Sequence, residues 1–310
     1  MITIFKSTDL GLEPMEALAD GSWVHMVNPG AEDIAHLHEQ FSIPTDYITS
    51  PLDVHERART EREDGCMLIV LRIPYFEGDQ ADIPYITVPL GIILTERVIL
   101  TVCKFKTPVI DSLAGGRVRG LSTTRRTRFV LQLLMAVATL YLSYLRNIND
   151  RVEWLEDKLQ RSLQNKEVLE LLKYQKSLTY FTTALKSNDL MLGRLQKMRL
   201  FRQDEEDEDL LDDVMTEIEQ AIEMTKISSD ILSQMMDAFA SIISNNLNVV
   251  MKFLASFTIV LALPSVIASI YGMNVDLPFQ EHRYAFLITM GAALLVSLVT
   301  VYVFWRKDWL

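Results

Sequence analysis

The chain has 310 residues, of which 49% are hydrophobic and 23% charged, and its formal net charge is −11. This acidic balance argues against nucleic acid as a partner, because binding to phosphates calls for an excess of basic residues. The apolar residues are concentrated near the C-terminus, where residues 253–275 and 284–305 contain no charge. Each run exceeds the roughly 20 residues that cross a bilayer, so the sequence predicts an integral membrane protein.

Residues 1–123 predict a cytoplasmic α/β domain. Apolar, β-branched runs bounded by turn residues indicate strands, and apolar residues three apart indicate a helix. The expected elements are strands at 23–27 and 66–73, a helix at 31–40, and a hairpin formed by 85–94 and 97–103. Cys66 and Cys103, the only cysteines, lie in apolar runs. We therefore expect buried, reduced thiols rather than a disulfide.

The middle of the chain predicts long helices. Residues 125–247 contain no proline and only one glycine, Gly193, and leucines, alanines and charges recur at helical spacing. The expected elements are a cytoplasmic helical hairpin over 124–206, with helices at about 125–163 and 165–201, and a stalk helix over 207–271 that becomes the first membrane span at about 250–271. The acidic run 204–209 is interpreted as a solvated loop, with cation gathering as the alternative.

Charge predicts how the chain crosses the membrane. A loop at 272–283 and a second span at 284–305 are followed by a basic tail at 306–310. Basic segments beside spans stay on the cytoplasmic side. With two spans, both termini are then cytoplasmic, and we expect a multi-pass protein of the cell membrane.

One face of the long helix stays small or polar, with the single exception of Met251. Steps of alternately four and three residues meet Asp230, Gln234, Asp237, Ser241, Ser244, Asn248, Met251, Ala255, Thr258, Ala262, Ser265 and Ser269. This 3.5-residue period keeps one face toward a common axis when parallel copies supercoil. Two interpretations fit the stripe within the lipid: close packing of helices, or the lining of a water-filled path that several subunits enclose.

The acidic residues favour the second interpretation. Asp230 and Asp237 continue the stripe outside the apolar run. Carboxylates that face a shared axis form stacked rings, which repel one another unless cations lie between them. A solvated helix face is the alternative for these two residues.

The turn after the first span carries a short motif, residues 271–274 (YGMN). Gly272 allows a tight turn, and Asn274 supplies a neutral amide oxygen at the mouth of the axis. A ring of such oxygens suits hydrated Mg²⁺, because this ion gives up its water reluctantly.

This motif, placed between two C-terminal spans, resembles the signature of the CorA family of magnesium transporters. Residues 305–310 (WRKDWL) are similar to that family's basic terminus, and residues 248–252 (NVVMK) are similar to the start of its pore helix. The resemblance covers the whole layout of α/β domain, stalk helix and two spans. It implies a funnel-shaped homopentamer in the lipid bilayer, in which the first span lines the pore and the second forms an outer ring.

The resemblance also implies roles for single residues. Gly272, Met273 and Asn274 would form the selectivity filter, and Met251 would be a hydrophobic constriction beside Asn248. The implied pore lining is Asp237, Ser241, Ser244, Asn248, Met251, Ala255, Thr258, Ala262, Ser265 and Ser269. Ala262 and Ser265 depart from the methionine or threonine that members often place on the deeper pore wall.

A regulatory metal site is implied as well. Asp213 would match the stalk-helix member of an intersubunit Mg²⁺ site, and Asp64 is its expected partner. Mg²⁺ is thus expected both as the transported ion and as a regulator, with no organic cofactor. Bound Mg²⁺ would cancel the repulsion between these carboxylates and hold the pore closed, and its loss would let the Met251 constriction open.

The sequence leaves two alternatives open. A Zn²⁺, Co²⁺ or Ni²⁺ transporter of the same superfamily is one of them. A membrane-anchored coiled-coil signalling protein is the other, although it does not explain the polar stripe. The chain contains no nucleophile elbow, phosphate loop or zinc-protease motif, so an enzyme is not expected.

Overall fold

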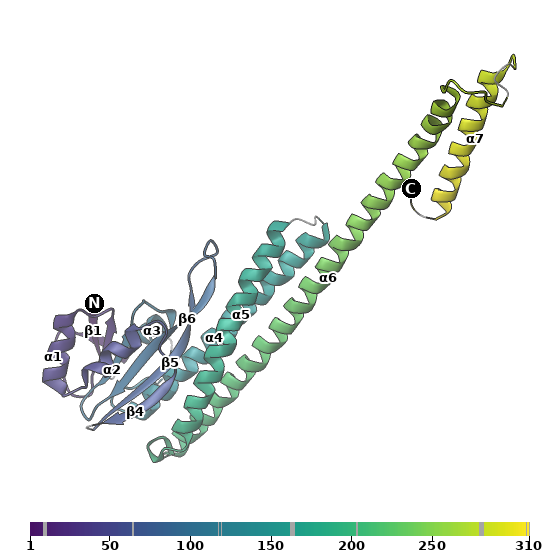
Figure 1. Ribbon diagram of the computed structural model, residues 1–310. Helices are drawn as coiled ribbons and strands as arrows, with labels where there is room; N and C mark the ends of the chain where they lie inside the picture. Colours follow the sequence, from purple (N-terminus) through teal and green to yellow (C-terminus); the bar gives the residue numbers. More distant parts are fainter. Residues whose placement is uncertain are drawn as a thin grey trace. The chain divides into compact units, whose positions relative to one another are not determined.

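The computed structural model describes residues 1–8, 11–63, 65–116, 118, 120–161, 165–202, 204–278, 282–307 and 309. The chain divides into two compact units, Met1–Met235 and Met236–Leu310. The N-terminal unit holds the sheet and most of the helices. The C-terminal unit holds the last part of α6 (Glu205–Tyr271) together with α7 (Ala285–Arg306), and α6 is continuous through both units (Figure 1).

A seven-stranded sheet of order β2-β1-β3-β7-β6-β5-β4 organises the N-terminal unit. Its strands are β1 Ile2–Thr8, β2 Gly11–Met15, β3 Trp23–Val27, β4 Arg59–Glu63, β5 Cys66–Phe76, β6 Tyr85–Leu94 and β7 Ile99–Cys103. Among the described strands, β3 and β7 pair in parallel and the other neighbours pair antiparallel. The predicted strands β3, β5, β6 and β7 and the β6–β7 hairpin are confirmed, whereas the sequence did not indicate β1, β2 or β4.

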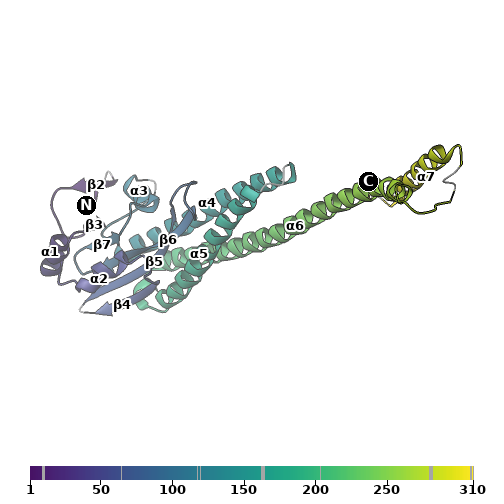
Figure 2. The same cartoon turned by 45° about the horizontal axis from the view of Figure 1, so that its top comes forward.

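Helices cover both faces of this sheet (Figure 2). On one face, Leu68, Val70 and Ile93 join a buried cluster with side chains of α1 (Ala31–Phe41) and α2 (Thr45–Thr49). On the other face, the ring of Trp23 lies 5.0 Å from the ring of Phe129 in α4, and both side chains are fully buried. Because side chains alternate along a strand, one run of apolar residues serves both faces.

Close packing against β6 comes from η1 (Ser50–Leu52). An added Cβ at Gly91 would lie 2.2 Å from Cγ of Pro51. The proline ring therefore occupies the space that any larger residue at position 91 would need.

The two cysteines are buried, and they form no disulfide among the described residues. Burial raises the pKa of the Cys103 thiol to about 11, and its Sγ lies 3.3 Å from the carbonyl oxygen of Pro89. The prediction of reduced thiols in the core is confirmed.

The predicted helical hairpin is present as α4 (Arg126–Arg161) and α5 (Asn165–Gln196). The remaining helices are α3 (Pro108–Ala114) and the 3-10 turn η2 (Arg199–Arg202). In the N-terminal unit, α6 lies beside this hairpin (Figures 1 and 2), and the amide of Gln175 donates to the hydroxyl groups of Ser229 and Ser233 at 3.1 and 3.2 Å.

The interpretation of residues 204–209 as a loop was wrong, because α6 already begins at Glu205. Glu205, Glu206, Asp207 and Glu208 form its first turn, where carboxylates interact favourably with the helix dipole. The carboxylate of Asp204 also accepts the backbone N–H of Glu206 at 3.2 Å. The run is therefore a helix start rather than a linker.

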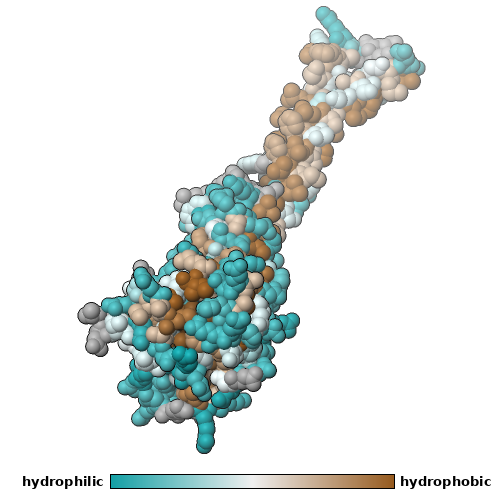
Figure 3. All heavy atoms as spheres, turned by 90° about the vertical axis from the view of Figure 1, so that its left-hand side faces the viewer, coloured by the Kyte–Doolittle hydropathy of each residue, from teal (hydrophilic) through white to brown (hydrophobic). Residues whose placement is uncertain are grey.

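Three described helices, α4, α6 and α7, are long and apolar enough to cross a membrane. The most apolar window of α4 is 61% buried, against 6% for the windows in α6 and α7. The apolar surface of α4 is thus accounted for by the core of the N-terminal unit. Apolar side chains remain on the surface of α6 and α7, where the space-filling view is mostly brown (Figure 3).

Candidate ion pathway and metal site

One face of α6 packs toward α7 in the C-terminal unit. Ser256 is fully buried there, and Val260, Leu263 and Ile267 are partly covered. These residues follow at intervals of four, three and four, so they share one side of the helix. Helix α7 runs alongside this part of α6 (Figure 1), and its Ala293 is buried.

The predicted stripe lies on the opposite side of α6. Thr258, Ala262 and Ser265 each lie two residues from a covered position, which is more than half a turn around the helix. All the stripe residues of this unit are exposed in the single chain: Asp237, Ser241, Ser244, Asn248, Met251, Ala255, Thr258, Ala262, Ser265 and Ser269. The small and polar face therefore points away from α7 and is open to further copies of the chain.

Hydroxyl groups on this stripe present oxygen lone pairs. The hydroxyl of Thr258 donates to the carbonyl of Leu254 at 2.7 Å, and the hydroxyl of Ser265 donates to the carbonyl of Leu261 at 3.2 Å. Because their hydrogens are used within the helix, the outward sides of these oxygens are acceptors. Acceptor oxygens suit a hydrated cation, whose water molecules point hydrogens outward.

Helix α6 ends at the predicted filter motif. The backbone N–H of Gly272 bonds to the carbonyl oxygens of Ala268 and Ser269 at 3.0 and 3.2 Å. An added Cβ at Gly272 would lie 3.5 Å from these same two oxygens, which is ordinary contact. A single chain therefore does not need glycine for this turn. Met273 and Asn274 follow and are exposed.

Of the two predicted regulatory residues, Asp213 and Asp64, the structure describes only Asp213. Asp213 is an exposed residue of α6, and its carboxylate has no hydrogen bond or ion pair with the part of the chain that the structure describes. Asp64 lies outside the described residues. Within the described ranges, no three His, Cys, Asp or Glu side chains are grouped closely enough to hold a metal ion. The carboxylate of Asp213 is the kind of oxygen ligand that Mg²⁺ takes.

The acidic residues at the start of α6 are paired with arginines. Nη1 of Arg128 lies 2.9 Å from Glu206 and 3.3 Å from Asp207, and Arg125 forms an ion pair with Asp204. This network joins the start of α4 to the start of α6. No local sequence pattern indicated this network. The cation-gathering alternative for this run is not favoured, because three of its carboxylates already have cationic partners.

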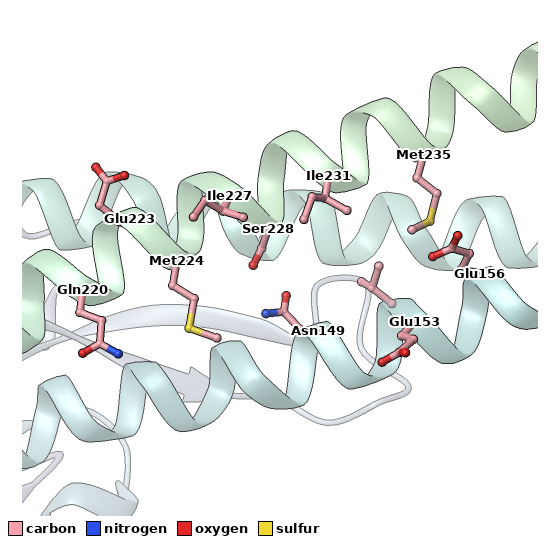
Figure 4. Close-up of a pocket in the computed structure, with 11 residues that line it drawn as sticks. Asn149, Glu153, Glu156, Gln220, Glu223, Met224, Ile227, Ser228, Ile231 and Met235 are labelled. Carbon is pink, nitrogen blue, oxygen red and sulfur yellow. The ribbon is translucent and has the colours of Figure 1, made fainter.

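A groove of about 510 Å³ lies between α4 and α6 (Figure 4). Met224, Ile227 and Ile231 of α6 line it, with Asn149 and Glu153 of α4 on the facing side. Ile227 and Ile231 are more than half exposed. The sequence did not indicate this groove, and its exposed apolar residues come from α6, the same helix that carries the stripe.

An α/β unit followed by two exposed helices that are long and apolar enough to cross a membrane is the layout of an integral membrane protein. The family described as CorA-like Mg²⁺ transporter protein matches residues 19–307, and the chain belongs to this family. Its members are transporters and not enzymes, so the chain is a transporter of divalent cations. The family resemblance read from the motif is confirmed.

The relatives and solved structures agree in layout. The cobalt/magnesium transport protein CorA of Methanocaldococcus jannaschii is 28% identical over 298 residues, which cover 93% of this chain and 91% of the relative. The protein of the same description from Thermotoga maritima is 23% identical over 99% of this chain and 88% of its own length. The complete structure of the M. jannaschii CorA magnesium transporter superposes with a TM-score of 0.86 at 25% identity, covering 100% of this chain and 99% of that one.

A more distant structure shows the fold alone. Full-length CmaX matches with a TM-score of 0.72 at 18% identity, over 98% of this chain and 96% of its own. The predicted fold class, an α/β domain followed by a long helix and two C-terminal apolar helices, is confirmed. Family membership also favours the transporter prediction over the signalling protein.

Proposed function

We propose that the chain forms a Mg²⁺ channel of the cell membrane, built from five copies around a central axis. The observation that carries this proposal is the small, polar and exposed face of α6 opposite α7. Two helices of one chain cannot enclose a path, so copies must share one. With the stripe inward, α7 takes the outer position, where its apolar surface meets lipid.

The proposed path handles the ion with its water shell. Asn274 forms a ring of amide oxygens at the outer mouth, next to Gly272 and Met273. Thr258 and Ser265 present acceptor oxygens along the path. Oxygens of this kind hydrogen-bond to the water around Mg²⁺ without replacing it. Asp237 adds a ring of carboxylates, which attracts cations at the inner end.

We propose that cytoplasmic Mg²⁺ controls opening through Asp213 and Met251. Asp213 has an exposed carboxylate, and in a pentamer it would share Mg²⁺ with an acidic residue of the neighbouring copy, for which Asp64 is the candidate. Met251 is 62% exposed on the stripe, and a ring of methionines is a hydrophobic constriction. Mg²⁺ must bind the closed state more tightly than the open state for this control to work.

The proposed topology places both termini in the cytoplasm. Arg306 and Lys307 directly follow the second apolar stretch, and basic residues at such a position remain inside. Since the chain then crosses the membrane twice, the N-terminal unit lies on the same side as the tail and can sense the internal Mg²⁺ concentration.

The test is Mg²⁺ uptake into liposomes that contain the purified protein. Wild type is expected to take up Mg²⁺, and Asn274→Ala is expected to lose most of this uptake. Asn246→Ala is the matched control, because Asn246 is exposed on α6 but lies two residues from both Ser244 and Asn248, on the other side of the helix from the stripe.

Competition measures the preference for the ion. Added Co²⁺, Ni²⁺ or Zn²⁺ is expected to slow the uptake of labelled Mg²⁺ less than the same concentration of unlabelled Mg²⁺ does. If wild type moves Zn²⁺ and leaves Mg²⁺ outside, the Mg²⁺ proposal is wrong and the zinc alternative stands. If Asn246→Ala loses uptake as Asn274→Ala does, the stripe is not the path.

A further inference from the structure

A second pocket, of about 540 Å³, lies in the N-terminal unit, and neither Asp213 nor any stripe residue lines it. Three segments build it: the loop at residues 54–57, strands β5 and β6 through Arg72 and Thr87, and one face of α5 between Thr179 and Leu190. We call it the α5 pocket. Its volume is in the range of pockets that hold small organic molecules.

The α5 pocket is basic, although the chain as a whole carries a net charge of −11. Arg57, Arg72 and Lys186 line it, together with His55. Glu56 is its acidic lining residue, and one carboxylate oxygen of Glu56 lies 2.5 Å from Nη1 of Arg59. The acid is therefore neutralised outside the pocket, and the cations inside it are left in excess.

Arg72 is a cation without a carboxylate partner. Its Nη1 donates to the carbonyl oxygens of Val54 and Glu56 at 2.7 and 2.9 Å, and its Nε and Nη2 donate to the Thr87 hydroxyl at 3.2 and 2.9 Å. Nη2 also donates to the carbonyl of Thr87. Among the described residues, no carboxylate lies within ion-pair distance of this guanidinium.

The half-buried charge of Arg72 has no counter-ion in contact with it, and the carboxylates of Asp53 and Glu56 act on it only from beyond ion-pair distance. Burial lowers the pKa of its guanidinium, yet an arginine stays protonated at neutral pH. A charge partly removed from water without an opposite charge in direct contact is unfavourable, so an anion bound beside Arg72 would be stabilised. Because every N–H of this group is already used, Arg72 acts on a bound anion through its electric field rather than through a direct hydrogen bond.

Arg57 and Lys186 supply direct contacts. Both side chains are exposed at the pocket, and neither forms an ion pair with the residues that the structure describes. The hydroxyl of Ser187, one residue further along α5, likewise has no hydrogen-bond partner in the described ranges. Two exposed cations and the Ser187 hydroxyl, all lining the same pocket as the Arg72 guanidinium, match the oxygens of a phosphate group.

The rim adds flat apolar surface. The ring of Tyr180 is 44% exposed and Leu190 is 71% exposed, and both line the pocket. An exposed aromatic ring offers a surface on which a planar base can stack. We propose that the α5 pocket binds a nucleotide-sized organic phosphate, with the phosphate between Arg57 and Lys186 and the planar group on Tyr180.

Equilibrium dialysis with radiolabelled AMP tests this site. The full chain is used in detergent micelles with a chelator present, since AMP then binds without divalent metal and without any transport step. Failure here is therefore distinct from failure of the proposed channel. Wild type is expected to bind AMP, and the double variant Arg57→Gln/Lys186→Gln is expected to bind it at least about tenfold more weakly.

The matched control is Arg62→Gln/Lys176→Gln. It changes the same residue types on β4 and α5, at exposed positions outside the pocket, and its AMP affinity is expected to stay near that of wild type. Tyr180→Leu is expected to weaken AMP binding and to leave the binding of inorganic phosphate unchanged. No AMP binding by wild type at millimolar concentration, or equal losses in the two double variants, would overturn the proposal. Equal affinity for AMP and inorganic phosphate would overturn the proposal that the planar base of AMP stacks on Tyr180.

Discussion

Asn188 of α5 completes the sheet at Arg72 of β5. Its side-chain oxygen accepts the backbone N–H of Arg72 at 2.8 Å, and its amide nitrogen donates to the backbone carbonyl of Arg72 at 2.7 Å. The edge strand β4 pairs with β5 only as far as Arg59 opposite Val70. Arg72 lies two residues beyond that pair, so its outward backbone groups have no strand to bond to, and the amide takes the strand's place.

Asn188→Leu is expected to destabilise the N-terminal unit. Asn188 is 2% exposed, and the change removes two hydrogen bonds and leaves the backbone N–H of Arg72 without its partner. We expect a loss of about 1–3 kcal/mol in the free energy of unfolding, seen as a lower melting temperature of the full chain in detergent. Asp189→Leu is the control, because that neighbour is exposed. Equal melting temperatures for Asn188→Leu and wild type would show that the amide contributes nothing.

The strands that could be predicted are the ones that carry their own apolar signal. β5 and β7 are buried along most or all of their length, so their sequences are apolar runs interrupted only by Arg72 in β5 and Thr101 in β7. β4 (RTERE) is mostly exposed at the edge of the sheet. Its strand conformation comes from pairing with β5, and composition alone gives no sign of such tertiary pairing.

In the candidate site, too, local features could be predicted from the sequence and contacts between distant residues could not. The stripe on α6 could be predicted because helical periodicity is local, and the fixed spacing places Thr258 and Ser265 on one face. The contact between Arg72 and Asn188 joins residues 116 positions apart, and no local pattern encodes it. The pairing of Arg128 with Asp207, 79 positions apart, was missed for the same reason.

A larger side chain on the stripe should block the proposed ion path. Ala262→Leu places a large side chain on the exposed face opposite α7, and we expect at least about a tenfold loss of Mg²⁺ uptake in liposomes, because the leucine narrows and dries the path. Ala292→Leu is the matched control, since Ala292 is exposed on α7 and meets lipid in the proposed assembly. A loss of uptake in Ala292→Leu alone would place the path on α7 instead.

Asp213→Ala should weaken inhibition by internal Mg²⁺. Removal of the carboxylate removes a ligand that favours the closed state, so uptake should continue at internal Mg²⁺ concentrations that stop wild type. The measurement is the internal Mg²⁺ concentration that halves the uptake rate, and we expect a rise of about tenfold. Asp212→Ala is the comparison, because this exposed acid points to a different side of α6. An unchanged value in Asp213→Ala would remove this residue from the regulatory site.

Met251→Ser should make the closed state leak. A hydroxyl in place of the thioether allows water into the constriction, which a ring of apolar Met251 side chains otherwise keeps dry. We expect Mg²⁺ entry at high internal Mg²⁺, where wild type is closed, measured as uptake of an external isotope. Val250→Ser is the control, since the neighbouring Val250 is also exposed but lies off the stripe. Leak in the control and none in Met251→Ser would locate the constriction elsewhere.

His25 should make the N-terminal unit sensitive to acid. Nδ1 of His25 lies 2.9 Å from the hydroxyl of Thr101. This hydroxyl oxygen accepts the indole N–H of Trp23 at 2.8 Å. The Thr101 hydroxyl hydrogen is thus free to bond to Nδ1, and the ring is held neutral. Burial, with a smaller contribution from a nearby positive charge at the amino terminus, lowers the pKa of His25 from 6.5 to about 4.

The sign of the effect follows from the two states. Between pH 6.5 and about 4 the unfolded chain binds a proton at His25 and the folded chain does not, so stability falls as the pH is lowered, by up to about 3 kcal/mol. The melting temperature of wild type should therefore drop more steeply from pH 7 to pH 5 than that of His25→Gln, which has no group to titrate there. His36→Gln changes an exposed histidine and should follow wild type. Parallel curves for wild type and His25→Gln would mean that the buried ring takes up its proton in the folded state.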